Sequence, residues 1–157
     1  MTVALLSIVV ITAVAETPGS GQPAATAGEP KPLTTRKPYK LSSADAAGPV
    51  FNSKAAVKQT DPSDGPVTDV VLMKSRDGRF EAGLYEAGPS DYAIDAYPDD
   101  EFIYVLSGAI TLVSADGSVV EGRAGESLVI PRGWKGRWKT DGYRKYYVTY
   151  SGPPKGK

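Results

Sequence analysis

The stretch "PDDEFIYVLSGAITL", residues 98–112, decides the fold of this chain. Its run of Phe, Ile, Tyr, Val and Leu is typical of a β-strand, and Ser107-Gly108 interrupts it before a second run begins at Ala109. A single glutamate, Glu101, stands at the head of the first run. A carboxylate that is carried into a β-sheet core needs a partner, so the role of Glu101 is the central question.

Similar runs follow one another through the second half of the chain. Asp77-Gly78, Asp116-Gly117 and Asp141-Gly142 are turn signals that separate runs rich in Val, Ile, Tyr and Phe. No segment repeats apolar residues at helical intervals for more than a turn or two. The pattern predicts an all-β domain, a sandwich or closed barrel of antiparallel strands, with strands at residues 67–75, 79–87, 101–108, 109–115, 126–131, 136–140 and 144–150.

The amino-acid composition limits which catalytic and metal-binding groups this protein can use. A length of 157 residues is sufficient for one domain, and 18 basic residues balance 18 acidic ones, which argues against a nucleic-acid partner. The chain has no cysteine, so disulfides, thiolate catalysis and Cys-based zinc sites are excluded. It has no histidine either, so the usual general base and the commonest metal ligand are missing. Chemistry here must depend on carboxylates, tyrosines, lysines, arginines or the backbone.

The N-terminus is typical of an exported protein. An uncharged apolar run from Val3 ends in Ala13-Val14-Ala15, which predicts a signal peptide over residues 1–15 and a mature chain beginning at Glu16, in the periplasm or outside the cell. A buried strand or helix of the domain is the alternative. No membrane contact is expected after cleavage. Residues 16–40, rich in Pro, Ala and Gly, are predicted to form a flexible linker.

The packed domain is expected in the second half. All aromatic residues except Tyr39 and Phe51 lie at or after Phe80. We therefore assign residues 67–157 to the domain and residues 41–66 to an N-terminal arm that lies on it, with Phe51 and Val57 as its anchors.

Two spaced motifs identify a family resemblance. The stretch "GPSDYAIDAYPDDEFIYVLSG" (88–108) ends seven residues after Glu101, and "GESLVIPRGWKGRWKT" (125–140) places Gly125, Pro131 and Gly133 at fixed intervals. Together they resemble the two motifs of the cupin superfamily, which implies a jelly-roll β-barrel. With "RKYYV", they are similar to the group of ureidoglycine aminohydrolases and the ethanolamine-utilisation cupin. The resemblance covers roughly residues 67–150.

The resemblance implies four metal ligands, and only Glu101 of these is present. The His-x-His pair of the superfamily corresponds most nearly to Asp95 and Tyr97, and the later histidine to Gly136. Ureidoglycine aminohydrolase activity relies on manganese in that group. We therefore expect no cofactor, although a weak Mn, Mg or Ca site made by Asp95 and Glu101 is left open.

The remaining residues predict a polar, aromatic lumen. Residues two apart on a strand share a face, so Asp95 is expected to point with Tyr97, and the cupin pattern turns Glu101 into the same space. Gly136 leaves a hole that Trp138, two residues on, could fill or border. The resemblance adds Lys145 and Tyr147 as neighbours. The predicted ligand-binding set is Asp95, Tyr97, Glu101, Trp138, Lys145 and Tyr147.

Each of these residues could also serve only the packing of the barrel. Three functions are therefore compared. The first is a metal-free module that binds a small polar molecule of carbonyl, ureido or sugar-like chemistry. The second is an enzyme with Glu101 as general acid or base. The third is a structural or dimerising cupin without a ligand, in which Glu101 is a buried carboxylate with internal partners and a homodimer is one arrangement.

Overall fold

The computed structural model describes residues 38–153, so the predicted signal peptide (1–15) and nearly all of the predicted linker (16–40) lie outside the described residues. Among residues 38–153 no helix is long and apolar enough to cross a membrane. The described chain contains a short helix, a 3₁₀ helix and nine strands: α1 (Ser43–Ala46), η1 (Pro49–Asn52), β1 (Val57–Asp61), β2 (Gly65–Lys74), β3 (Phe80–Ala87), β4 (Ser90–Ile94), β5 (Asp100–Ser114), β6 (Val119–Arg123), β7 (Ser127–Ile130), β8 (Gly136–Thr140) and β9 (Tyr143–Tyr150).

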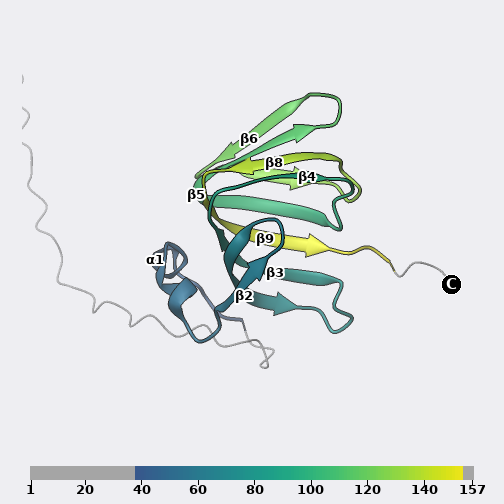
Figure 1. The fold of residues 1–157 in the computed structure, drawn as a ribbon. Helices are drawn as coiled ribbons and strands as arrows, with labels where there is room; N and C mark the ends of the chain where they lie inside the picture. The colour runs from purple at the N-terminus through teal and green to yellow at the C-terminus, as the bar shows by residue number, and fades with distance from the viewer. Residues whose placement is uncertain (1–37, 154–157) are drawn as a thin grey trace, which may run out of the picture.

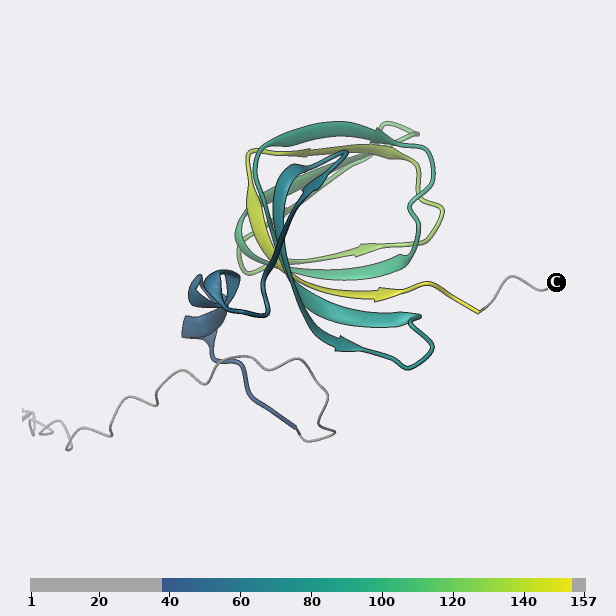
Figure 2. The same cartoon turned by 60° about the horizontal axis from the view of Figure 1, so that its bottom comes forward.

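The strands form one curled antiparallel sheet. Its order is β1-β2-β3-β9-β5-β8-β4, and β6 and β7 both pair with β5. Figure 1 shows the strands stacked across the molecule, and Figure 2, turned by 60°, shows the sheet curling round a common interior. This is the jelly-roll barrel that the sequence predicted.

Strand β5 connects the two halves of the barrel. Its first half pairs with β7 and β9, and its second half pairs with β6 and β8. The prediction of two strands divided at Ser107-Gly108 is wrong, because the strand runs on through Gly108. This glycine has a φ of 74°, and a Cβ there would lie 2.0 Å from the carbonyl oxygen of Gly142. Glycine at 108 therefore marks a close approach of β5 to the turn between β8 and β9, not a chain reversal.

Side chains along each strand point alternately into the barrel and out of it. On β5, Glu101, Ile103 and Val105 are buried, whereas Phe102 and Tyr104 are exposed. The interior is mostly apolar and aromatic. Its buried residues are Val67, Ala87, Ile103, Val105, Ile110, Leu112, Leu128, Ile130, Trp138 and Tyr143.

The N-terminal arm covers the outer face of the sheet. Val70 of β2 and Leu84 of β3 point outward, and Phe51 packs in the same cluster at 2% exposure. Arg144 of β9 lies over the Phe51 ring at 5.4 Å and donates to the Ala47 carbonyl oxygen. Phe51 is thus an anchor of the arm, as predicted.

Val57 is not an anchor, because it is 57% exposed at the start of β1. Strand β1 pairs with β2 along its whole length, so the sheet begins within the segment that was assigned to the arm, before residue 67. Strands β1, β4 and β6 were not predicted. Strands β1 and β6 are short and mostly exposed, so they lack the apolar run that marks the others.

Candidate functional site

Glu101 lies inside the barrel beside a lysine. It is 4% exposed, and its Oε1 accepts a hydrogen bond from Nζ of Lys145 at 2.8 Å. The hydroxyl of Tyr97 donates to its other oxygen, Oε2. Lys145 is itself only 6% exposed, so the two charges form a buried ion pair. Such a pair is stable only when its remaining polar atoms have partners, and the Tyr97 phenol supplies one of them.

The Lys145 ammonium is enclosed by aromatic rings. Its Nζ lies 5.2 Å from the centre of the Trp138 ring, and the rings of Tyr85, Tyr143 and Tyr147 are 5.4, 5.6 and 5.9 Å away. Aromatic faces attract a cation, and the attraction is strongest where water is excluded. Carboxylate and rings together therefore hold the ammonium at one place in the barrel.

Tyr97 positions the carboxylate through its ring and its backbone. The ring stacks on Trp138, with centroids 6.5 Å apart and planes within 2°. The backbone exchanges hydrogen bonds of 2.8 Å with Trp134 and Gly133 in the turn before β8. Burial raises the pKa of the Tyr97 phenol far above its ordinary value, and the negative Glu101 raises it further. Tyr97 is therefore a neutral donor.

Trp138 contributes a donor that has no acceptor. The side chain is 1% exposed, and its Nε1 has no hydrogen-bond partner in the described part of the chain. A buried N–H without a partner costs free energy unless water or a ligand supplies an acceptor. Lys145 also has three N–H donors, of which one meets Glu101. The interior thus has one buried donor, the Trp138 indole N–H, without an acceptor among residues 38–153.

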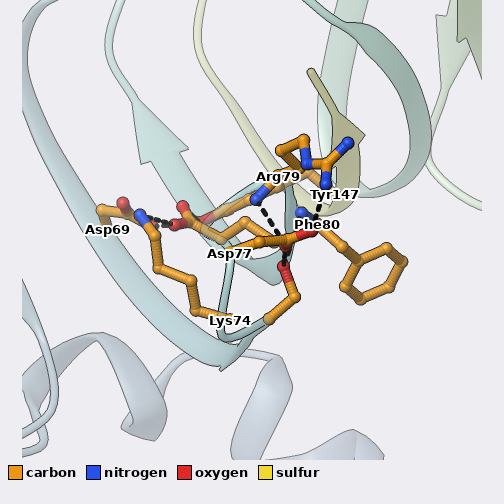
Figure 3. Close-up of polar contacts among 8 residues, drawn as sticks. Asp69, Lys74, Asp77, Arg79, Phe80 and Tyr147 are labelled. Atoms are coloured by element: carbon orange, nitrogen blue, oxygen red, sulfur yellow. Dashed lines mark hydrogen bonds and ion pairs between the residues drawn. The ribbon is translucent and has the colours of Figure 1, made fainter. Parts of the chain in front are cut away.

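Tyr147 faces the barrel interior with its ring near Lys145, but its hydroxyl contacts two other carboxylates, those of Asp69 and Glu81. The hydroxyl oxygen is 3.0 Å from both Asp69 Oδ1 and Glu81 Oε1, and Lys74 pairs with Glu81 at 2.7 Å (Figure 3). Gly83, directly opposite Tyr147, makes room for the phenol, since a Cβ there would lie 2.6 Å from its oxygen.

Asp95 does not share a face with Tyr97, so that expectation is corrected. Strand β4 ends at Ile94, Asp95 lies in the bend that follows, and its side chain is exposed. Strand alternation no longer applies beyond the end of β4. The structure thus brings together Tyr97, Glu101, Trp138 and Lys145, with the ring of Tyr147 beside them, and leaves Asp95 outside.

A second buried carboxylate, Asp64, was missed by sequence reasoning. It is 8% exposed in the turn between β1 and β2, and it accepts hydrogen bonds from Ser90 Oγ at 2.8 Å and Tyr143 hydroxyl at 3.4 Å. Tyr85 and Tyr143, which also flank Lys145, stack on each other in the same region. The polar sequence around Asp64 is typical of an exposed turn. Only the strand alternation that points Tyr85 and Tyr143 into the barrel could have indicated that a carboxylate lies between them.

A cleft approaches the interior near Glu101. Its volume is about 270 Å³, and Ile130, the cross-strand neighbour of Glu101, lines it together with Leu112, Leu128 and Trp134. Trp134 touches Tyr97 edge to face at 6.4 Å. Trp134 therefore connects the lining of the cleft with Tyr97.

The sequence matches one protein-family model. The model of the EutQ-like cupin domain matches residues 74–147, slightly less than half of the chain. No curated protein matches the sequence significantly.

Solved structures of similar fold come from several bacteria. EutQ of Clostridium difficile is 28% identical, over 62% of this chain and 76% of that one, with a TM-score of 0.49. A protein of unknown function from Pseudomonas syringae pv. tomato is 16% identical, over 60% of this chain and 43% of that one, with a TM-score of 0.55. A protein of unknown function from Rhizobium leguminosarum is 21% identical, over 74% and 99%, with a TM-score of 0.51. The last two likenesses concern the fold alone.

The cupin metal site does not fit these residues. Both oxygens of Glu101 already accept hydrogen bonds, from Lys145 and Tyr97, and the sequence has no histidine. Within residues 38–153 no group of three His, Cys, Asp or Glu side chains is placed to hold an ion. Asp95 is exposed while Glu101 is buried, so burial does not support the two-carboxylate site that was left open.

Trp134 occupies the space at Gly136, where the resemblance places a histidine. A Cβ on Gly136 would lie 2.4 Å from Cζ2 of the Trp134 indole, and Trp134 Nε1 donates to Ser114 Oγ at 3.1 Å. We predicted that Trp138 could fill or border this space. Trp134 fills it instead, because the Pro131–Gly133 turn places the Trp134 indole over Gly136.

Proposed function

We propose that this cupin is a metal-free module that binds a small molecule carrying an acceptor oxygen, such as a carbonyl, carboxylate or ureido compound. The observation that carries the proposal is the unpaired Nε1–H of Trp138 in a barrel whose only near cation, among the described residues, is the Lys145 ammonium. An acceptor that meets both donors would remove the cost of the unpaired indole N–H.

Glu101 would orient the ligand through the groups that it holds. It fixes Lys145 at 2.8 Å and Tyr97 through the phenol, so the donors face one direction before a ligand arrives. Such preorganisation lowers the entropy cost of binding. Ureidoglycine aminohydrolase chemistry, which the resemblance implies, would need manganese ligands that these residues do not supply. Export of the mature chain to the periplasm or beyond is part of the same proposal.

A titration followed by NMR tests the proposal. Acetate, acetamide and urea are added separately to the ¹⁵N-labelled protein, and the two tryptophan indole signals are compared. We expect at least one probe to move the Trp138 signal saturably. The Trp134 signal is the internal control, because its N–H already has Ser114 as acceptor.

Substitution of the carboxylate sharpens the test. Glu101→Gln should weaken the binding of an active neutral probe, acetamide or urea, because an amide holds Lys145 and Tyr97 less firmly than the carboxylate does. The loss should be on the scale of a charged hydrogen bond, roughly 1.5 to 3 kcal/mol, or about 10- to 150-fold. Asp91→Asn, which removes a carboxylate from the exposed pair with Arg137, should leave affinity unchanged.

The second candidate is a structural cupin without a ligand. It is favoured by the internal partners of Glu101, both of whose oxygens are bonded to protein side chains. If none of the probes moves the Trp138 signal and Glu101→Gln only lowers the melting temperature, the binding proposal fails and the structural role stands.

A further inference from the structure

The Glu101 carboxylate requires a positive partner inside the barrel. It is 4% exposed, on a strand whose inward neighbours Ile103 and Val105 are fully buried. An ionised carboxylate in such surroundings is stable only with a cation and hydrogen-bond donors close by. In metal-binding cupins, the glutamate of this motif has a metal ion as that partner, according to the resemblance described above.

We infer that the Lys145 ammonium is the built-in cation of this barrel and stands in place of the metal ion. It meets Oε1 of Glu101 at 2.8 Å, on the one carboxylate that the resemblance places among the metal ligands. The inference does not depend on the binding of any small molecule, because it concerns the protein's own charges.

The aromatic surroundings support this assignment. The rings of Tyr85, Trp138, Tyr143 and Tyr147 all lie between 5.2 and 5.9 Å from Nζ, an aromatic enclosure that suits an ammonium. A divalent ion at Glu101 would lie against the ammonium and be repelled by it.

Chemical rescue tests the inference. Lys145→Ala deletes a three-carbon ammonium tail, which n-propylammonium matches in size and charge. We expect Lys145→Ala to melt about 10 °C or more below the native protein, because Glu101 is left uncompensated. Millimolar n-propylammonium chloride should restore much of this loss saturably. The neutral isostere 1-propanol should not restore it. Lys139→Ala, at an exposed position on strand β8, should respond to neither compound.

A second variant covers the case in which Lys145→Ala does not fold. Lys145→Met keeps the length of the side chain and removes the charge. It should be less stable than the native protein, because Glu101 is left without a cation inside the barrel. Lys145→Met that is as stable as the native protein from about pH 4 to 7 would overturn the inference.

Two other results would also overturn it. One is equal rescue of Lys145→Ala by 1-propanol and n-propylammonium, which would show that the cavity needs volume and not charge. The other is stoichiometric Mn²⁺ binding by the native protein that is lost on Glu101→Gln, measured by elemental analysis after dialysis. Failure of the acetate, acetamide and urea titrations would leave these outcomes unchanged, so the two proposals fail separately.

Discussion

At the scale of single residues, the Tyr147 hydroxyl presents an unusual arrangement. A phenol has one proton, yet its oxygen lies 3.0 Å from carboxylate oxygens of both Asp69 and Glu81. The phenol can donate to one of them, and the other contact is favourable only when that carboxyl carries a proton. Burial raises the pKa of Asp69, and the nearby Glu81 adds to this effect, while the bond from Tyr147 and the charge of Lys145 oppose it.

This raised pKa has a consequence for stability. The native state binds the Asp69 proton more tightly than the unfolded state, where the pKa has its ordinary value of 3.8. The stability that Asp69 contributes is therefore fully present below that value and is lost as pH rises through the native pKa. Asp69→Asn should remove this loss. The free energy of unfolding of the variant, measured in urea, should therefore rise relative to that of the native protein as pH increases from about 4 towards 7.

Asp91→Asn is the control, because the pKa of Asp91 is shifted in the opposite direction. The hydrogen bond from Arg137 lowers the pKa of Asp91, so the stability it contributes is lost as pH falls. The prediction for Asp69 would be contradicted if Asp69→Asn and the native protein kept a constant difference in stability across the pH range.

At the scale of the elements, the pairing of β3 with β9 depends on a missing side chain. Gly83 lies opposite Tyr147, and a Cβ on it would lie 2.6 Å from the phenol oxygen and 2.7 Å from the Val70 carbonyl oxygen. The carbonyl belongs to β2 and cannot move without disturbing the sheet. Gly83→Ala should therefore destabilise the protein by about 1 to 3 kcal/mol, as expected for overpacking, measured by urea unfolding.

Gly88→Ala is a matched control, because nothing lies within 4 Å of a Cβ at that position. It should cost little. Equal stability of the two variants would mean that Tyr147 adapts without loss and that its position between the two carboxylates is not fixed by the β3–β9 packing.

The elements also show where sequence reasoning succeeded. The strands with an apolar run and an Asp-Gly turn were predicted, because turn chemistry and alternation are local properties. Strand β6, whose pattern is mostly exposed, and the continuity of β5 through Gly108 depend on pairing with distant strands. The inward position of Glu101, Lys145 and Tyr147 was predicted from the family resemblance. The prediction for Asp95, which used strand alternation, is wrong because β4 ends at Ile94.

Asp64 and Trp134 could not be found in the same way. Asp64 is buried because Ser90 and Tyr143, distant in sequence, close over a polar turn. Trp134 fills the space at Gly136 because of the path of one turn. The ion pair of Glu101 and Lys145 was indicated only by the family resemblance, since 44 residues separate the two along the chain.

At the scale of the whole molecule, the predicted export remains to be tested. The apolar run that ends in Ala13-Val14-Ala15 predicts cleavage before Glu16. Intact-mass measurement of the protein recovered from its native envelope or medium should give a chain that begins at Glu16. A mass that includes Met1 to Ala15 would contradict the prediction and favour a leader that stays with the domain.

The central claim for the whole barrel is that a lysine ammonium serves as its cation. NMR of the protein with ¹⁵N-labelled lysine side chains observes this group directly. We predict one ammonium signal that is protected from exchange with water, shifted upfield by the surrounding rings, absent in Lys145→Met, and unchanged when Mn²⁺ is added. A spectrum without a protected ammonium signal, or one in which stoichiometric Mn²⁺ abolishes it, would show that Lys145 is not the cation of the barrel.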